Sequence, residues 1–135
     1  MLPSQWALVG FVLWTLLIVL LGIGVPRVGS VLRKEARPNS FVASVPHGTE
    51  RYQRTLRAHL NCVENLPVFA AVVLAAYAIG QRQVADSVAM WVLLARVAQS
   101  TTHLIGVNHM LVMIRATFFT IQSVLIVYMI GKLLL

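Results

Sequence analysis

A row of polar side chains stands at the head of the second apolar segment of the chain, in and just before the stretch RAHLNCVENLP, residues 57–67. At 100° per residue, Arg54, Arg57, Asn61 and Glu64 fall within an arc of about 80°, so that they share one helix face. Guanidinium groups bind carboxylates, an amide bonds to peptide groups, and a carboxylate accepts an ammonium. The row therefore suits an anionic ligand that also carries an amine.

The two following apolar segments carry similar rows. Arg96, Gln99 and His103 lie close together by the same angular count, and Arg115 and Gln122 are seven residues apart and nearly superposed. Ionisable groups below the headgroups of a membrane cost several kcal/mol when they are unpaired, so they face the interior of a bundle or a wet cavity. We therefore expect the three rows to face one another.

Two interpretations of these charges remain open. We count Glu64 as the only acid available to the membrane segments, and as a structural residue it would neutralise Arg57, Arg96 or Arg115 between helices. In the functional interpretation, the excess of cations over this one carboxylate forms a pocket that opens toward the cytosol and binds a ligand.

The segments that must position these residues belong to a membrane protein. Of the 135 residues, 59% are apolar and 11% are charged, and the mean hydropathy is +0.81, which leaves too little polar surface for a soluble globule. We predict an all-α fold, a four-transmembrane-helix bundle that forms one domain over residues 1–135. The expected helices are approximately 5–25, 50–79, 84–105 (interrupted only by Arg96) and 110–132.

Local signals set two of the expected boundaries. Gly22, Gly24 and Pro26 should end the first helix, and Thr49 should cap the second, with Glu50 in its first turn.

Positive charge is concentrated between the first two apolar segments, and the formal net charge is +7. Seven of the eleven Lys and Arg residues lie there: Arg27, Arg33, Lys34, Arg37, Arg51, Arg54 and Arg57. This is the pattern that orients membrane proteins, so the basic first connection is expected in the cytosol and nucleic acid is not expected as a partner. Contact with anionic membrane lipids is consistent with the same charge.

Cysteine and histidine offer little for a metal site. One cysteine, Cys62, excludes an internal disulfide framework and a cysteine-based metal centre. His103 and His109 are six residues apart, which does not place them on one helix face, and no carboxylates cluster with them. We expect no metal.

The pattern R-A-x-x-N-x-x-E-N-x-P at the start of the second of four helices, after a basic loop, resembles the MAPEG family (membrane-associated proteins in eicosanoid and glutathione metabolism). Glu50-Arg51 and Arg54 upstream, and Ala95-Arg96-Val97 on the third helix, extend the resemblance over nearly the whole chain. It implies a homotrimer that binds glutathione between neighbouring subunits at the cytosolic side. The candidate cosubstrate-binding residues are Arg54, Arg57, Asn61, Glu64, Arg96, Gln99 and His103.

The resemblance also implies chemistry. Arg115 would be the catalytic residue, because a guanidinium near the glutathione thiol favours the thiolate. The chain departs from the glutathione-using enzymes at Asn65, Gln99 and His103, where those enzymes commonly have tyrosine. Arg115 also lies further from the third-helix residues than the family's arginine usually does. The run of residues 96–122 is similar to a bacterial branch of the family, and the bacterial inner membrane is the expected location.

Two functions follow from the resemblance. One is a glutathione-dependent transferase or peroxidase that acts on a lipophilic electrophile from the bilayer. The alternative is a non-catalytic member that uses its basic mouth to bind anionic lipid or a partner protein. A channel or transporter subunit is less favoured, because paired broken helices are absent from the sequence pattern.

Overall fold

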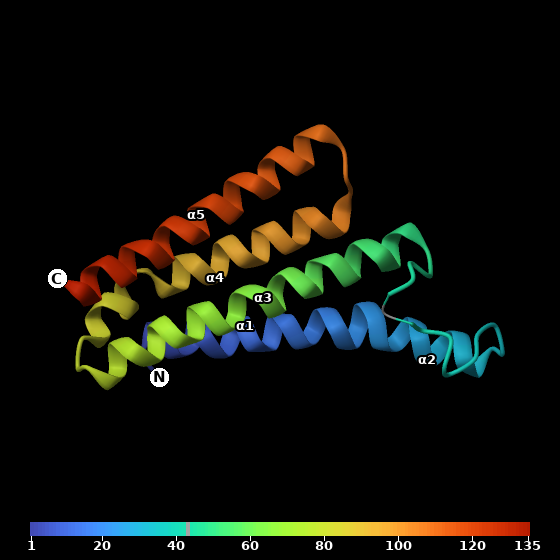
Figure 1. Ribbon diagram of the computed structural model, residues 1–135, viewed down its shortest axis with the longest axis horizontal. Helices are drawn as coiled ribbons and strands as arrows, with labels where there is room; N and C mark the ends of the chain where they lie inside the picture. The colour runs from blue at the N-terminus through green and yellow to red at the C-terminus, as the bar shows by residue number, and fades with distance from the viewer. Residues whose placement is uncertain (43) are drawn as a thin grey trace.

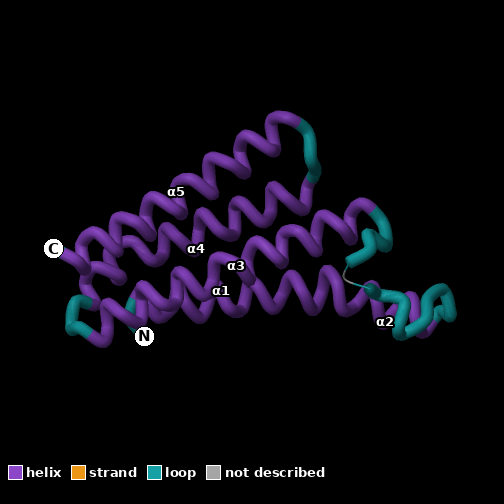
Figure 2. Tube along the Cα trace, in the orientation of Figure 1, coloured by secondary structure: helices purple, strands orange, loops and turns teal. Residues whose placement is uncertain are grey.

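The computed structural model describes residues 1–42 and 44–135, and within them it forms a bundle of long helices (Figure 1). Loops are short and lie at the two ends of the bundle, except for the connection after α2 (Figure 2). The elements are α1 (Pro3–Val19), the π-helical turn η1 (Leu20–Gly24), α2 (Val25–Leu32), α3 (Glu50–Ala78), α4 (Arg82–Ile105) and α5 (His109–Leu134). The described residues contain no strand, in agreement with the all-α prediction.

The N-terminal helix is longer than we predicted. α1, η1 and α2 follow one another without interruption from Pro3 to Leu32, so the expectation that the glycines and Pro26 end the helix near residue 25 is wrong. Pro26 stands in the first turn of α2, where the missing N–H is tolerated. In η1 the N–H of Val25 bonds to the carbonyl of Leu20, five residues back, which widens the helix without breaking it.

Gly22 explains why the wider turn is placed there. A Cβ on this residue would lie 2.3 Å from Cγ2 of Thr55, so only glycine permits η1 to approach α3 this closely. Thr55 is itself buried in that contact. The tertiary contact, rather than a local helix-ending signal, accounts for the glycine.

Within residues 1–42 and 44–135, three helical stretches are long and apolar enough to cross a membrane: Pro3–Leu32, Glu50–Ala78 and His109–Leu134. α4 is long enough as well, about 36 Å at 1.5 Å per residue, but it is not among these stretches, and its second half carries Arg96, Gln99 and His103. It contacts α1, α3 and α5, and is therefore the helix that the others surround most completely. The predicted helical bundle of a membrane protein is confirmed, and the polar side chains in the second half of α4 are largely buried: Arg96, Gln99, Ser100 and His103.

The core between these helices is apolar and closely packed. Phe11 of α1 lies against Phe69 of α3, with ring centroids 5.8 Å apart, and Ala85 and Ala89 of α4 are fully buried beside them. Small residues on α4 let the neighbouring helix backbones approach. Many leucines and valines on the outer surface are exposed, as expected of side chains that meet lipid.

A hydrogen-bonded cluster joins three helices at the end of the bundle that holds both termini. Asp86 of α4 accepts from the backbone N of Ser4 at 3.1 Å and from its Oγ at 2.5 Å, and this Oγ lies 2.9 Å from Oη of Tyr77 on α3. The count that made Glu64 the only acid in the membrane segments was therefore wrong. Asp86 lies in the first turns of α4, and it holds α1 in place rather than contributing to the arginine-rich end.

At the opposite end, the basic connection folds back onto the helices. Tyr52 of α3 accepts a hydrogen bond from Nε of Arg27 at 2.5 Å and lies 3.2 Å from Nε2 of His47. Thr49 accepts from the backbone N of Tyr52 at 3.2 Å, which confirms it as the cap of α3. Asn108 caps α5 in the same way, through the backbone N of Leu111.

Candidate functional site

A polar cavity of about 310 Å³ lies between α3, α4 and α5, close to the connection over residues 106–108. α5 diverges from α4 toward this connection (Figure 1). Four polar side chains reach the cavity, one from α3, two from α4 and one from α5: Asn61, Gln99, His103 and Arg115. Val112, Ala116 and Phe119 of α5 supply the rest of its wall. Of the candidate residues, these four meet within a single chain, whereas Arg54, Arg57, Glu64 and Arg96 do not line the cavity.

Helical spacing accounts for this arrangement. Gln99 and His103 are four residues apart on α4 and are 5% and 6% exposed, so they form one buried face. Arg115 is half-buried in the second turn of α5, and Asn61 is half-buried on α3. Each of the three helices therefore contributes at least one polar side chain to the cavity at this end of the bundle.

Two more arginines stand on α3 before Asn61, outside the lining of the cavity. Arg54 and Arg57, like Arg115, lie close enough to His103 for their charges to act on it. Arg54 is half-buried, its Nη1 lies 3.8 Å from a carboxylate oxygen of Glu50, and its Nε is buried without a hydrogen-bond partner. Arg115 is the arginine that lines the cavity, and a cation there can attract a ligand with negative groups.

Arg96 takes a different place from the one we expected. It is fully buried and does not line the cavity, and its guanidinium lies 5.5 Å from the ring centroid of Phe11 in the bundle core. Its Nη1 donates to Oε1 of Gln99, while Nε and Nη2 have no hydrogen-bond partner. Because Oε1 of Gln99 is occupied, its amide nitrogen is the group that remains for a ligand acceptor.

Glu64 forms no ion pair in the part of the chain that the structure describes. It is exposed on α3, as is Arg57, although its charge lies near enough to act on Arg96. The structural interpretation, in which Glu64 directly neutralises an arginine of another helix, is therefore not observed within one chain. Arg57 and Glu64 do not line the cavity and are exposed on the helix that carries Asn61.

A chain of amide side chains continues from the cavity toward the middle of the bundle. Nδ2 of Asn65 donates to the carbonyl of Asn61 at 2.8 Å, and Oδ1 of Asn65 accepts from Nε2 of Gln122 at 3.3 Å. Gln122 is fully buried, and its Oε1 has no partner. Asn65 thus links α3 to α5 below the cavity.

The sequence did not identify every residue that matters here. No sequence pattern identified Val112 and Phe119 of the apolar wall, because apolar residues occur on both the lipid-facing and the protein-facing sides of a membrane helix. Asp86 could have been found, since a carboxylate four residues after Arg82 interrupts an otherwise apolar segment. The described residues contain no group of three or more His, Cys, Asp or Glu side chains that could hold a metal ion.

Comparisons with known proteins bear on the family but name no individual relative. Comparison with curated proteins and comparison with solved structures each gave no match. The family model described as the MAPEG family matches residues 11–135, which is nearly the whole chain and includes every residue of the polar cavity. The chain belongs to the MAPEG family.

Proposed function

We propose that this protein is a glutathione-dependent transferase or peroxidase that acts on lipophilic electrophiles from the bilayer. The observation that carries the proposal is the polar cavity, in which Asn61, Gln99, His103 and Arg115 meet from three helices. Membership of the MAPEG family supports glutathione as the ligand, because the family is generally associated with it.

The residues present fit the chemistry of glutathione. Its two carboxylates suit Arg54 and Arg57, which lie close enough to His103 for their charges to act on it and of which Arg54 has a buried, unpartnered Nε. Its ammonium suits the exposed carboxylate of Glu64. Its peptide groups suit the amides of Asn61 and Gln99.

Arg115 has the catalytic role in this proposal. Bound glutathione supplies a thiol, and its thiolate form is the nucleophile or reductant. The Arg115 guanidinium lines the cavity, and a cation beside a thiol stabilises the thiolate. Phe119 and Val112 form an apolar wall on the same helix, along which a membrane-soluble electrophile would approach.

Assembly into a homotrimer is part of the proposal. In a single chain Glu64 is exposed on α3 directly before the uncharged run of residues 65–81, and an uncovered carboxylate below the headgroups costs several kcal/mol. A second copy packed on this face would remove the charge from lipid. We propose that the assembly lies in the bacterial inner membrane. In it, α4 would cross the membrane inside the bundle, and the basic connection would lie in the cytosol.

Calorimetric titration of the purified protein in detergent with glutathione tests the proposal. We expect saturable binding that weakens by about tenfold or more in Arg57→Ala, since charge-assisted hydrogen bonds contribute about 1.5–3 kcal/mol. Arg37→Ala is the matched control, because Arg37 is an exposed arginine of the connection that does not line the polar cavity. Absence of binding at millimolar glutathione rejects the proposal.

A second measurement isolates Arg115. In Arg115→Ala the ultraviolet absorbance of the glutathione thiolate should disappear, whereas binding of S-methylglutathione, which has no ionisable thiol, should remain close to that of the wild type. Equal loss of both signals would make Arg115 a binding residue rather than a catalytic one. Binding without thiolate absorbance in the wild type would contradict the enzyme and leave a carrier.

A further inference from the structure

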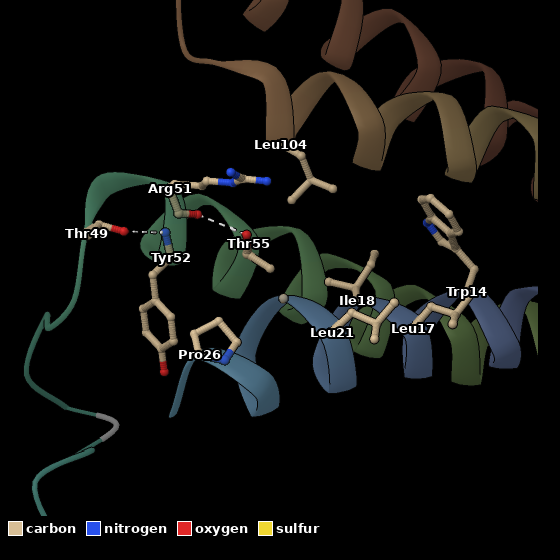
Figure 3. Close-up of a pocket in the computed structure, with 11 residues that line it drawn as sticks. Trp14, Leu17, Ile18, Leu21, Pro26, Thr49, Arg51, Tyr52, Thr55 and Leu104 are labelled. Carbon is tan, nitrogen blue, oxygen red and sulfur yellow. Dashed lines mark hydrogen bonds between the residues drawn. The ribbon is translucent and has the colours of Figure 1, made fainter. Parts of the chain in front are cut away.

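A second and larger cavity lies between a different set of helices. It has a volume of about 520 Å³ and is enclosed by the N-terminal helix, the first turns of α3 and the last turn of α4 (Figure 3). This volume is within the range of about 300–1,000 Å³ that is typical of small-molecule sites. It shares no lining residue with the polar cavity of the candidate active site.

The lining of this cavity is amphipathic along its length. In Figure 3, Arg51 lies at one end and Trp14 at the other, with Ile18, Leu21 and Leu104 between them. The wall formed by the N-terminal helix runs from Trp14 to Pro26, roughly 18 Å at 1.5 Å per residue. The cavity therefore offers an elongated apolar trough with one cation at its end.

The guanidinium of Arg51 is free to bind an anion. Within the described chain it forms no hydrogen bond or ion pair, whereas Arg54 approaches Glu50 and Arg33 contacts Glu35. Only the backbone carbonyl of Arg51 is engaged, as the acceptor for Oγ1 of Thr55. An unpaired arginine beside the basic connection lies at the depth where lipid headgroups are found.

We propose that this cavity binds a single-chain amphiphile with an anionic head group, drawn from the surrounding membrane. The head group would pair with Arg51, and the chain would lie along Leu17, Ile18 and Leu21 toward Trp14. A free inorganic anion would gain no binding free energy from the apolar wall, and a cationic amphiphile would be repelled by Arg51. The proposal does not depend on glutathione binding, because no residue of the polar cavity takes part.

Fluorescence quenching by dibromostearate, a fatty acid whose bromine atoms quench tryptophan at short range, tests the site. The full-length chain is placed in phosphatidylcholine nanodiscs, with the exposed Trp6 and Trp91 changed to Phe so that Trp14 is the only indole. A second variant, Trp6→Phe with Trp14→Phe, keeps only Trp91. We expect saturable quenching of Trp14 and quenching of Trp91 that rises only in proportion to the acid in the membrane.

Matched variants test each end of the site. Arg51→Ala should raise the half-saturating concentration by about tenfold, while Arg37→Ala, which removes the same charge from the connection, should leave it unchanged. Leu21→Phe should weaken binding by narrowing the trough. Leu20→Phe should not, because Leu20 is comparably exposed and does not line the cavity.

Three outcomes would overturn the proposal. Quenching of Trp14 that is no more saturable than that of Trp91 would show that the acid only partitions into the membrane. An unchanged affinity in Arg51→Ala, or equal quenching by the methyl ester of the same acid, would remove the head-group contact. Displacement of the acid by millimolar inorganic phosphate would make the site one for small anions.

Discussion

Replacing Gly22 by alanine should loosen the contact between the π-helical turn η1 and α3. The new Cβ would lie 2.3 Å from Cγ2 of Thr55, well inside the 3.4–4 Å of ordinary van der Waals contact. Thr55 cannot easily turn away, because it is β-branched and its Oγ1 donates to the carbonyl of Arg51 at 2.9 Å. The helices must therefore separate, or the hydrogen bond must break.

Two opposing terms set the size of the effect. Overpacking of this kind costs about 1–3 kcal/mol, and alanine in place of glycine in a helix returns about 0.5–1 kcal/mol. The midpoints of the two ranges leave a net loss of stability of about 1 kcal/mol, which corresponds to a fall in melting temperature of about 3–6 °C for a chain of this size. Gly131→Ala is the control, because a Cβ there meets nothing within 4 Å, and it should be neutral or stabilising.

Thermal unfolding of the detergent-solubilised protein, followed by circular dichroism, provides the measurement. The double variant Gly22→Ala with Thr55→Ser should recover most of the loss, since serine lacks the clashing Cγ2 and keeps the hydroxyl. A single variant as stable as the wild type, or a double variant that shows no coupling, would refute the close approach of η1 to α3. The continuous path of the N-terminal helix would then need a different explanation.

Two further predictions concern the ends of the bundle. Asp86→Ala should lower the melting temperature by several degrees, because the two hydrogen bonds from Ser4 to this carboxylate are worth about 1–3 kcal/mol together. Tyr77→Phe should lower the melting temperature less. Equal effects of the two substitutions would contradict the role of Asp86 in holding α1 in place. In the connection, a hydrogen bond from Arg33 lowers the pKa of Glu35. The ion pair is therefore fully formed above the ordinary pKa of glutamate, and it is lost as the pH falls through the lowered pKa of Glu35. A carboxyl NMR titration should place the midpoint of Glu35 below its value in Arg33→Gln, and identical midpoints would exclude the contact.

The parts of the site that were predictable from the sequence are those that depend on periodicity. The spacing of Gln99 and His103 on one helix, and the position of Asn61 on another, required only 3.6 residues per turn and the cost of burying polar groups in lipid. The cap at Thr49 was predictable for the same local reason, since a hydroxyl before a helix satisfies a free backbone N–H.

The parts that were not predictable depend on which side chains meet across helices. Gly22 and Pro26 end helices in most contexts, and only the contact with Thr55 reveals why the chain continues through a π-helical turn here. The partner of Arg96 was also undetermined, because Gln99 is one turn away on the same helix and competes with the acid on α3. Contacts of this kind depend on how the helices pack against one another, and residue spacing along one helix does not predict that packing.

A cryo-electron map of the purified protein with saturating glutathione tests the central claim most directly. The account predicts density for the tripeptide in the cavity bounded by Asn61, Gln99, His103 and Arg115, with its sulfur beside Arg115 and with Glu64 covered by a neighbouring copy. An empty cavity at saturating glutathione, or Glu64 exposed to lipid in every copy, would contradict it.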